Sequence, residues 1–435
     1  MVSIVVRQSK ISGSVRCPSS KSYTHRAIAI ASLTQQQSII KNALLGRDTL
    51  ATLAGCSALG ANIKHEGTTL QVEGKHSFDP PDNVINAENS GTTIRILTSM
   101  SALVKRGGYT VLTGDESLRK RPMQPILDAL GQLLVEAYST KSNGTPPLVI
   151  KGGGIKGGET LIDGSISSQF ISGLLITGIF ADSDIVMRIK GGLVSKPYVI
   201  ATLSTMKNFG VTSVEYAPNM LEYSIKGAEY RGTEFDVPGD FSTAALILSA
   251  GALVGQKLEI KGLNFGLPQG DSQIIDIMKQ MGCEIKIDKV KGEVVVEGKS
   301  PLEGGDFNLS NTPDLLPVIS ILALKANSTV TINGVAHARV KETDRVANIA
   351  QELVKLGARI KEFPDGLAIT APNVLKNTLL NAYNDHRLFM AFTIAAMLTE
   401  KSIVAGAESV DVSYPNFISD MKDLGAKILP GPDRE

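Results

Sequence analysis

The sequence has no tryptophan, only three cysteines and few aromatic residues, at 5% of the chain. Cys17, Cys56 and Cys283 are an odd number in no paired spacing, which favours reduced thiols over a disulfide framework or a zinc site. The formal net charge of +1 gives no electrostatic basis for nucleic acid or an anionic membrane as the main partner. We therefore expect neither a bound metal nor a polyanionic partner.

Long apolar runs are also missing. Residues 1–15 alternate Val, Ile and polar residues, unlike the cationic start and apolar run of a signal peptide. Six stretches are almost wholly apolar, but each is shorter than the ~18 to 20 residues that cross a bilayer, which favours core helices buried on all sides. These stretches are 27–33, 94–104, 170–180, 244–254, 315–326 and 388–398. We expect a cytoplasmic protein without a membrane span.

A second kind of helix recurs with a glycine at its end. In 340–370, apolar residues at Val346, Ile349 and Leu353 predict an amphipathic helix, Gly357 ends it, and two strands follow. Corresponding glycines are Gly60, Gly131, Gly210, Gly282, Gly357 and Gly425, which lie 68 to 79 residues apart by subtraction. This spacing exceeds the roughly 20 to 50 residues of solenoid repeats, so each repeat must also contain one of the apolar helices.

The repeats predict two domains, as the length of 435 residues also does. The sixth repeat lacks its last strand, whereas unattached strands are predicted near the N-terminus at 4–7 and 13–16. Because unpaired edge strands are a liability, we predict that these strands complete the last repeats. One discontinuous domain of residues 1–17 and 232–435 and a second of 18–231 would then hold three repeats each, with the active site in the cleft between them.

Small polar residues and cations gather where the apolar helices begin. For any one helix these residues are ordinary N-caps, but six together indicate anion sites if the helix N-termini point the same way. An arginine inside a buried helix is costly unless an anion pairs with it. The cations are Lys21, Arg26, Arg95, Arg121, Lys196, Arg339, Lys341, Arg345 and Arg387. We expect ligands that carry phosphate and carboxylate groups.

The sequence resembles the enolpyruvyl transferase family over nearly its whole length. The motifs that carry the resemblance are Ser20–Ser22 with Arg26, Asn89–Arg95, Arg121–Pro122, Asp163–Gly164, Ser167–Phe170, Ser195–Tyr198, Pro313–Asp314, Val340–Arg345 and Asn384–Arg387. The resemblance implies an inside-out α/β barrel in each of two domains, with three βαβαββ repeats, buried helices and outer sheets. It also implies a transferase of the shikimate pathway, without a cofactor, that moves the enolpyruvyl group of phosphoenolpyruvate to the 5-hydroxyl of shikimate 3-phosphate and releases phosphate. Glyphosate occupies the phosphoenolpyruvate site in this family.

The resemblance also implies which residues bind each substrate. Shikimate 3-phosphate would be held by Lys21, Ser22, Arg26, Ser167, Ser168, Gln169, Ser195, Tyr198, Asp314 and Lys341. Phosphoenolpyruvate would be held by Lys21, Asn89, Gly91, Thr92, Arg121, Gln169, Arg345, His386 and Arg387. Gly91 also fits on physical grounds, because a residue without a side chain lets an anion approach the backbone closely.

Two carboxylates are expected to move protons. Asp314 is predicted at the start of a buried helix, whose dipole would favour its ionised form, so it is the expected base for the 5-hydroxyl. Glu342, assisted by Lys21, would transfer the proton at the enolpyruvyl carbon. The family pattern is broken at His337, where many members have Asn, and at Val412, where many have a Lys. One cationic contact to phosphoenolpyruvate is therefore missing or replaced.

Two alternatives share the predicted fold. The sister enzyme that acts on UDP-N-acetylglucosamine usually has a reactive Cys in a mobile loop, whereas the corresponding residues 118–122 contain no thiol. A non-catalytic anion-binding protein would be indicated by loss of Asp314 or Glu342, and both are present. We expect a monomer whose partners are its two small-molecule substrates.

Overall fold

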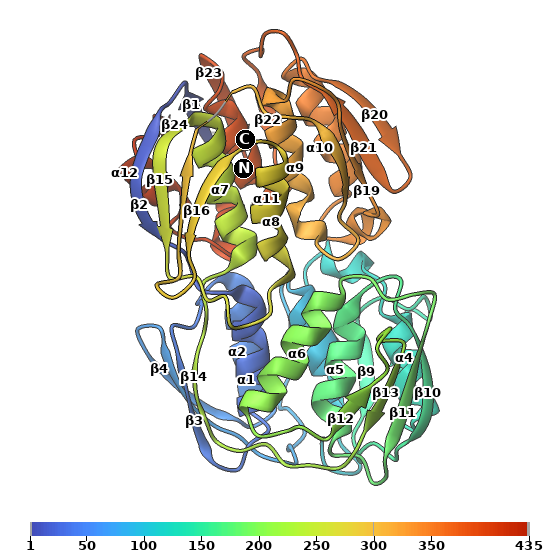
Figure 1. The fold of residues 1–435 in the computed structure, drawn as a ribbon. Helices are drawn as coiled ribbons and strands as arrows, with labels where there is room; N and C mark the ends of the chain where they lie inside the picture. The colour runs from blue at the N-terminus through green and yellow to red at the C-terminus, as the bar shows by residue number, and fades with distance from the viewer. Residues whose placement is uncertain (1, 299, 433–435) are drawn as a thin grey trace. The chain divides into compact units, whose positions relative to one another are not determined.

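The computed structural model describes residues 2–298 and 300–432. The chain forms two compact units, the first being Met1–Pro18 with Gly239–Glu435 and the second Ser19–Pro238. Within the described residues each unit contains three four-stranded sheets around buried helices (Figure 1). The predicted boundary at 231/232 is one strand too early, because β14 (Glu234–Asp236) pairs in parallel with β3 (Gln37–Lys41) of the second unit.

The fifth repeat shows the βαβαββ order most simply. Its strands and helices are β18 (Gly305–Asn308), α9 (Leu316–Leu322), β19 (Val330–Asn333), α10 (Arg345–Lys355), β20 (Arg359–Phe363) and β21 (Gly366–Thr370). The sheet order is β18-β19-β21-β20, with the first pair parallel and the others antiparallel. The apolar stripe of α10, including Val346, Ile349 and Leu353, is fully buried, so the predicted amphipathic helix is confirmed.

Strands distant in sequence complete three of the sheets. β1 (Ser3–Arg7) lies between β23 (Lys401–Ala405) and β24 (Ile428–Pro430) in the sixth repeat, where Figure 1 shows the blue β1 beside red strands. β2 (Ile11–Arg16) lies instead in the fourth repeat, parallel to β15 (Gly255–Lys261). β14 provides the first strand of the first repeat. Each N-terminal strand thus pairs where a sheet would otherwise lack one.

The remaining described strands form the same kind of sheet. They are β4 (Asn62–Glu66), β5 (Thr69–Glu73), β6 (Ile85–Asn86), β7 (Tyr109–Thr113), β8 (Ala137–Ser139), β9 (Leu148–Lys151), β10 (Gly158–Asp163), β11 (Ile185–Lys190), β12 (Val214–Tyr216), β13 (Glu222–Ile225), β16 (Glu284–Asp288), β17 (Glu293–Glu297) and β22 (Leu379–Asn381). Burial alternates along β5, β9 and β17, as the period of two in a strand predicts.

The six predicted apolar helices are all present and almost wholly buried. They are α1 (Lys21–Ala31), α3 (Gly91–Ser101), α5 (Ser168–Gly178), α7 (Phe241–Val254), α9 and α11 (His386–Ala396). Most begin before the predicted apolar run, because polar residues such as Lys21 form the first turn. In α9 a 3-10 turn, η3 (Pro313–Leu315), comes first, and η4 (Ala323–Lys325) follows. Of the helices described, none is long and apolar enough to cross a membrane.

The amphipathic helices end as predicted in five repeats of six. They are α2 (Arg47–Ala58), α4 (Gln124–Gln132), α6 (Lys196–Asn208), α8 (Ile274–Gln280), α10 and α12 (Phe417–Asp423). Five of the glycines follow their helix with positive φ, but Gly131 lies inside α4 and Leu134 has the left-handed φ of 61°. The prediction for Gly131 was therefore wrong. The intervals from Gly60 to Leu134 and from Leu134 to Gly210 are 74 and 76 residues, whereas those to and from Gly131 are 71 and 79. The more even spacing was the signal in the sequence that the helix ends at Leu134.

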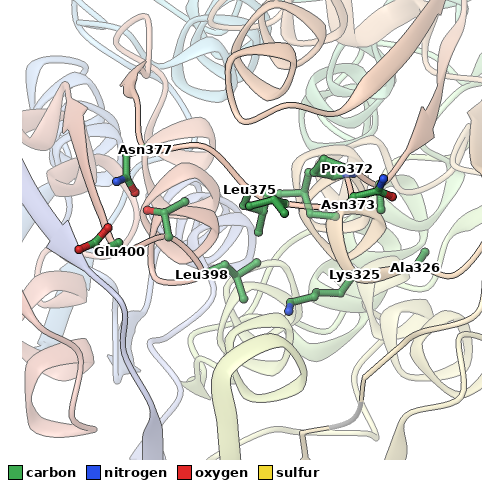
Figure 2. Close-up of a pocket in the computed structure, with 12 residues that line it drawn as sticks. Lys325, Ala326, Pro372, Asn373, Leu375, Asn377, Leu398 and Glu400 are labelled. Atoms are coloured by element: carbon green, nitrogen blue, oxygen red, sulfur yellow. The ribbon is translucent and has the colours of Figure 1, made fainter.

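A cavity of about 480 Å³ opens in the first unit at the C-terminal ends of α9 and α11. Figure 2 shows Lys325 and Glu400 on opposite sides of it, with Leu375 and Leu398 between them. Asp314 and Arg387, which were predicted for the site, lie at the opposite, N-terminal ends of these two helices. This cavity is therefore separate from the candidate site.

Candidate active site

A network of ion pairs in the first unit surrounds Arg345, the first residue of α10. Its side chain is 1% exposed, so its charge is held among protein groups. Nε donates to Asp385 Oδ2 at 2.7 Å, Nη1 to Asp314 Oδ1 at 2.8 Å and Nη2 to Glu342 Oε2 at 2.9 Å. We call Asp314, Lys341, Glu342, Arg345, Asp385 and Arg387 the Arg345 cluster. It brings together residues from three separate segments of the fifth and sixth repeats.

Asp314 lies among three cations of this cluster. Arg387 Nη2 is 3.0 Å from Asp314 Oδ2, and Lys341 Nζ is 3.9 Å from Oδ1. Burial by itself raises the pKa of Asp314, but Arg387, Lys341 and Arg345 outweigh it and hold that pKa well below its usual range. Asp314 lies in η3, the turn that runs directly into α9, so its predicted place at the start of a buried helix is confirmed. The three cations around it keep it ionised.

Asp385 links the cluster to α11. As N-cap of α11 it accepts hydrogen bonds from the backbone N–H of Arg387 at 2.9 Å and of Leu388 at 3.4 Å, while it also binds Arg345. Its side chain is fully buried. His386 follows in the first turn and is also 0% exposed. Sequence reasoning included Asp385 in a motif but assigned it no role; an N-cap aspartate beside a buried arginine was the available signal.

Two further titratable residues of the first unit have shifted pKa values. Burial and the charge of Asp314 raise the pKa of Asp271 to about 7, and Ser242 donates a hydrogen bond to its carboxylate. Burial and the charge of Lys341 lower the pKa of His337 to about 4. His337 Nε2 has no hydrogen-bond partner among the described residues. His337, noted above only as a departure from the family pattern, is thus a buried neutral imidazole near the cluster.

In the second unit, two guanidinium groups lie at the start of α3. A methyl group built on Gly91 would be 3.0 Å from Arg95 Nη1 and 3.1 Å from Arg121 Nη1. Arg121 Nη2 donates to Asn89 Oδ1 at 2.7 Å, and Arg95 Nη1 donates to Gln169 Oε1 at 2.7 Å. The absence of a side chain at Gly91 therefore leaves room for both cations beside the first N–H groups of the helix. We call Asn89, Gly91, Thr92, Arg95, Arg121 and Gln169 the Gly91 cluster.

Gln169 connects this cluster to α5. Its Nε2 donates to Thr92 Oγ1 at 2.9 Å, so the same side chain is bonded to α3 twice. Its backbone N–H donates to Ser167 Oγ, the N-cap of α5, at 3.3 Å. The predicted residues of α3 and α5 are therefore in direct contact.

Lys21 and Arg26 lie on α1 in different surroundings. Lys21 Nζ is 2.9 Å from Asp48 Oδ2 of α2, and the two side chains are 14% and 6% exposed. Arg26 is buried and donates to Thr202 Oγ1 at 2.7 Å, to the Ser22 carbonyl at 2.9 Å and to the Tyr198 carbonyl at 3.0 Å. Burial lowers the pKa of Arg26 to about 10. Sequence reasoning missed Asp48, whose position in the first turn of α2 gave no sign that it faces Lys21.

The remaining predicted residues of the second unit begin α5 and α6. Ser168 is the first residue of α5 and is 3% exposed. Ser195 precedes α6 with a left-handed φ of 54° and is 5% exposed. Tyr198, in the first turn of α6, accepts from Arg26 through its carbonyl. Arg26 therefore joins α1 to α6 at the end where these serines lie.

The two units differ in charge balance. In the Arg345 cluster three cations face three carboxylates, so an anionic ligand there must compete with protein carboxylates. In the second unit, no carboxylate of the described residues lies within ion-pair distance of Arg26 or Arg121. Buried cations with neutral partners favour an anion nearby. The geometry thus suits phosphate or carboxylate ligands, first of all in the second unit.

The fold is similar to that of solved EPSP synthase structures. The chain superimposes on a 2.37 Å structure of EPSP synthase from Acinetobacter baumannii with a TM-score of 0.83 and 25% sequence identity, covering 99% of this chain and 100% of the other. The fold predicted from the repeats is therefore confirmed at the level of the six α/β repeats.

Comparison of sequences finds relatives of higher identity than the solved structure above. Residues 5–421 match the family described as EPSP synthase (3-phosphoshikimate 1-carboxyvinyltransferase). Proteins named 3-phosphoshikimate 1-carboxyvinyltransferase are 48% identical in Nitrosopumilus maritimus and 44% identical in Methanocaldococcus jannaschii, each over 98% of this chain and 98% or more of the relative. The chain belongs to the EPSP synthase family.

Proposed function

We propose that the chain transfers the enolpyruvyl group of phosphoenolpyruvate to the 5-hydroxyl of shikimate 3-phosphate and releases phosphate. The family match and the names of the relatives support this reaction of the shikimate pathway. The observation that carries the proposal is the pair of arginines beside Gly91, since two guanidinium groups at a helix N-terminus suit a small ligand with both phosphate and carboxylate.

Each cluster is proposed to bind part of the substrates. The Gly91 cluster, with Lys21, would hold the anionic groups of phosphoenolpyruvate, and Arg345, His386 and Arg387 would complete its site. Ser22, Arg26, Ser167, Ser168, Ser195 and Tyr198, with Gln169, Asp314 and Lys341, would hold shikimate 3-phosphate. Arg26 would act through its charge, because its hydrogen bonds go to protein oxygens. The two substrates then require residues of both units.

The proposed chemistry is addition followed by elimination. In the addition, the 5-hydroxyl oxygen forms a bond to C2 of phosphoenolpyruvate, the hydroxyl proton goes to Asp314 and Glu342 gives a proton to C3. In the elimination, a proton returns from C3 to Glu342 as the C2–O bond to phosphate breaks, and Asp314 gives its proton to the departing phosphate, so both carboxyl groups regain their starting state. The low pKa of Asp314 favours the ionised form that accepts a proton. Lys21 and Arg345 would offset negative charge on the phosphate as it departs.

A phosphate-release assay tests the reaction directly. Purified protein with both substrates should release one phosphate for each enolpyruvyl group transferred, and omission of shikimate 3-phosphate should abolish release. UDP-N-acetylglucosamine in its place is the control for the sister activity. If phosphate is released with UDP-N-acetylglucosamine but not with shikimate 3-phosphate, the chain catalyses the sister reaction. If no phosphate is released with either acceptor, a non-catalytic anion-binding protein is favoured.

We also propose that the protein acts as a monomer in the cytoplasm. The three cysteines are buried and none of them forms a disulfide, which suits a reducing compartment. Light scattering coupled to gel filtration should give a mass near the 46.1 kDa of one chain. A mass of two chains or more would overturn the monomer.

A further inference from the structure

Helix α10 contacts the segment that precedes α11 at two points. The first is the bond of Arg345 to Asp385 described above. The second is made by Glu352, seven residues further along α10. Seven residues are about two turns, so both side chains lie on one face of the helix. Helix α10 therefore bonds to both ends of the connection between β22 and α11, and β22 itself lies against this helix.

Glu352 is an unusual residue for a helix interior. Its side chain is 0% exposed, although a buried carboxylate is costly unless it is fully hydrogen bonded. Oε1 accepts from the Tyr383 hydroxyl at 2.7 Å, and Oε2 accepts from the backbone N–H of Asn381 at 3.0 Å. Lys355 Nζ lies 2.7 Å from both oxygens. The carboxylate is thus satisfied, and two of its bonds go to the connection before α11.

That connection has a strained backbone. Tyr383 and Asn384 have φ values of 53° and 58°, so two consecutive residues with side chains are in the left-handed region. Such conformations are disfavoured and persist only where surrounding contacts enforce them. The Tyr383 N–H donates to Asn381 Oδ1 at 2.9 Å, and the Asp385 N–H donates to the Ala382 carbonyl at 2.9 Å. The turn brings the chain directly to Asp385.

The Tyr383 hydroxyl is suited to a permanent donor role. Burial, and then the hydrogen bond to Glu352, raise the pKa of Tyr383, so its proton is retained throughout the neutral range. The bond therefore fixes the side chain of one left-handed residue to α10. Nothing in this contact reaches the Arg345 cluster directly, so any effect on the reaction must pass through the backbone of 383–385.

We propose that Glu352 and Tyr383 are positioning residues that hold this left-handed turn and thereby place Asp385 and Arg387 for the binding of phosphoenolpyruvate. The inference rests on the proposed function for its substrate. If Tyr383 loses its bond to α10, the turn can relax toward ordinary backbone conformations. Asp385 then shifts against Arg345, and the start of α11 shifts with it.

The variant Tyr383→Phe tests the proposal with the smallest change. It retains the ring and removes one hydrogen bond to a buried carboxylate. Loss of a bond of this type changes an equilibrium constant by roughly 10-fold or more. We expect KM for phosphoenolpyruvate to rise by about that factor, while KM for shikimate 3-phosphate stays within about 2-fold. The matched control is Tyr230→Phe, which also removes a buried hydroxyl, bonded to the Ile176 carbonyl at 3.0 Å in the second unit. It should change neither KM.

A rescue separates positioning from simple stability. Asn384→Gly, added to Tyr383→Phe, should restore part of the affinity for phosphoenolpyruvate, because glycine adopts positive φ without a steric penalty. Glu352→Gln should resemble Tyr383→Phe, since its amide N–H₂ faces donors. If the wild type is active and Tyr383→Phe has an unchanged KM for phosphoenolpyruvate, the inference is overturned and the proposed function stays intact. An equal rise in both KM values, or a loss of melting temperature alone, would also overturn it, whereas an inactive wild type would overturn the proposed function itself.

Discussion

The substitution Gly91→Ala should stabilise helix α3 but weaken the binding of an anion beside it. Gly91 begins α3 without positive φ, so alanine fits the backbone and should favour the helix by up to about 1 kcal/mol. The added methyl group, however, would lie 3.0 Å from Arg95 Nη1 and 3.1 Å from Arg121 Nη1. Both distances are shorter than ordinary carbon contacts, so at least one guanidinium must move.

Neither guanidinium can move without loss of a hydrogen bond. Arg121 is held by Asn89 and Arg95 by Gln169, each at 2.7 Å. Displacing one arginine removes a charge-assisted hydrogen bond to the ligand. Such a bond contributes about 1.5 to 3 kcal/mol to the free energy of binding. That corresponds to a loss of roughly 10- to 100-fold in affinity for phosphoenolpyruvate. By the family resemblance glyphosate occupies the same site, so inhibition by glyphosate, competitive with phosphoenolpyruvate, should weaken in the same direction.

The measurements are steady-state kinetics and thermal unfolding of the same preparations. Gly131→Ala is the matched control, because Gly131 lies inside α4 and a methyl group there meets nothing within 4 Å. The control should be slightly more stable and kinetically unchanged. Gly91→Ala should be as stable as wild type or more so, yet have a raised KM for phosphoenolpyruvate. If Gly91→Ala has an unchanged KM and is inhibited by glyphosate as strongly as wild type, the anion site has been placed wrongly.

Three further predictions concern other parts of the chain. Asp314→Ala and Glu342→Gln should each lose at least ~100-fold in turnover while shikimate 3-phosphate still binds, measured by phosphate release and calorimetry; near-normal turnover with a lower melting temperature would make that residue structural. His337 has a pKa lowered from 6.5 to about 4, so its neutral form stabilises the fold above pH 6.5 and up to about 3 kcal/mol is lost as pH falls to 4. His337→Asn should flatten this part of the stability curve in denaturant titrations, and an identical curve would refute the burial argument. Shikimate 3-phosphate with an unreactive mimic of phosphoenolpyruvate should reduce the radius of gyration in X-ray scattering, and an unchanged radius would count against closure on the ligands.

The sequence alone determined the elements and their order. Helix α10 could be predicted because its apolar residues recur with helical spacing, and β21 because its residues alternate, and both patterns are local properties of the chain. Leu134 shows the limit of that reasoning. A leucine with positive φ is rare, so the pattern favoured Gly131, whereas α4 continues until packing ends it.

The family motifs also identified most of the candidate residues, but not what they contact. Asn89, Gly91 and Gln169 lie at helix starts that sequence reasoning had found, whereas Arg121 follows the 3-10 turn Leu118–Lys120. Their partners lie tens of residues away, as Gln169 does from Arg95, and no local pattern encodes such a distance. Hydrogen-bond partners of this kind are specified by how helices pack.

Only the tertiary structure decided which sheets β2 and β14 complete and which carboxylates surround Arg345, whereas the pairing of β1 in the sixth repeat was predicted from the sequence. β2 and β14 are short segments whose own pattern suits several sheets, and pairing depends on which edge is open when the chain is folded. Arg345 lies 31 residues from Asp314 and 40 from Asp385, and Glu352 lies 31 residues from Tyr383. Burial makes these contacts strong because water is excluded from them, and burial is a property of the packed chain that the spacing of residues does not contain.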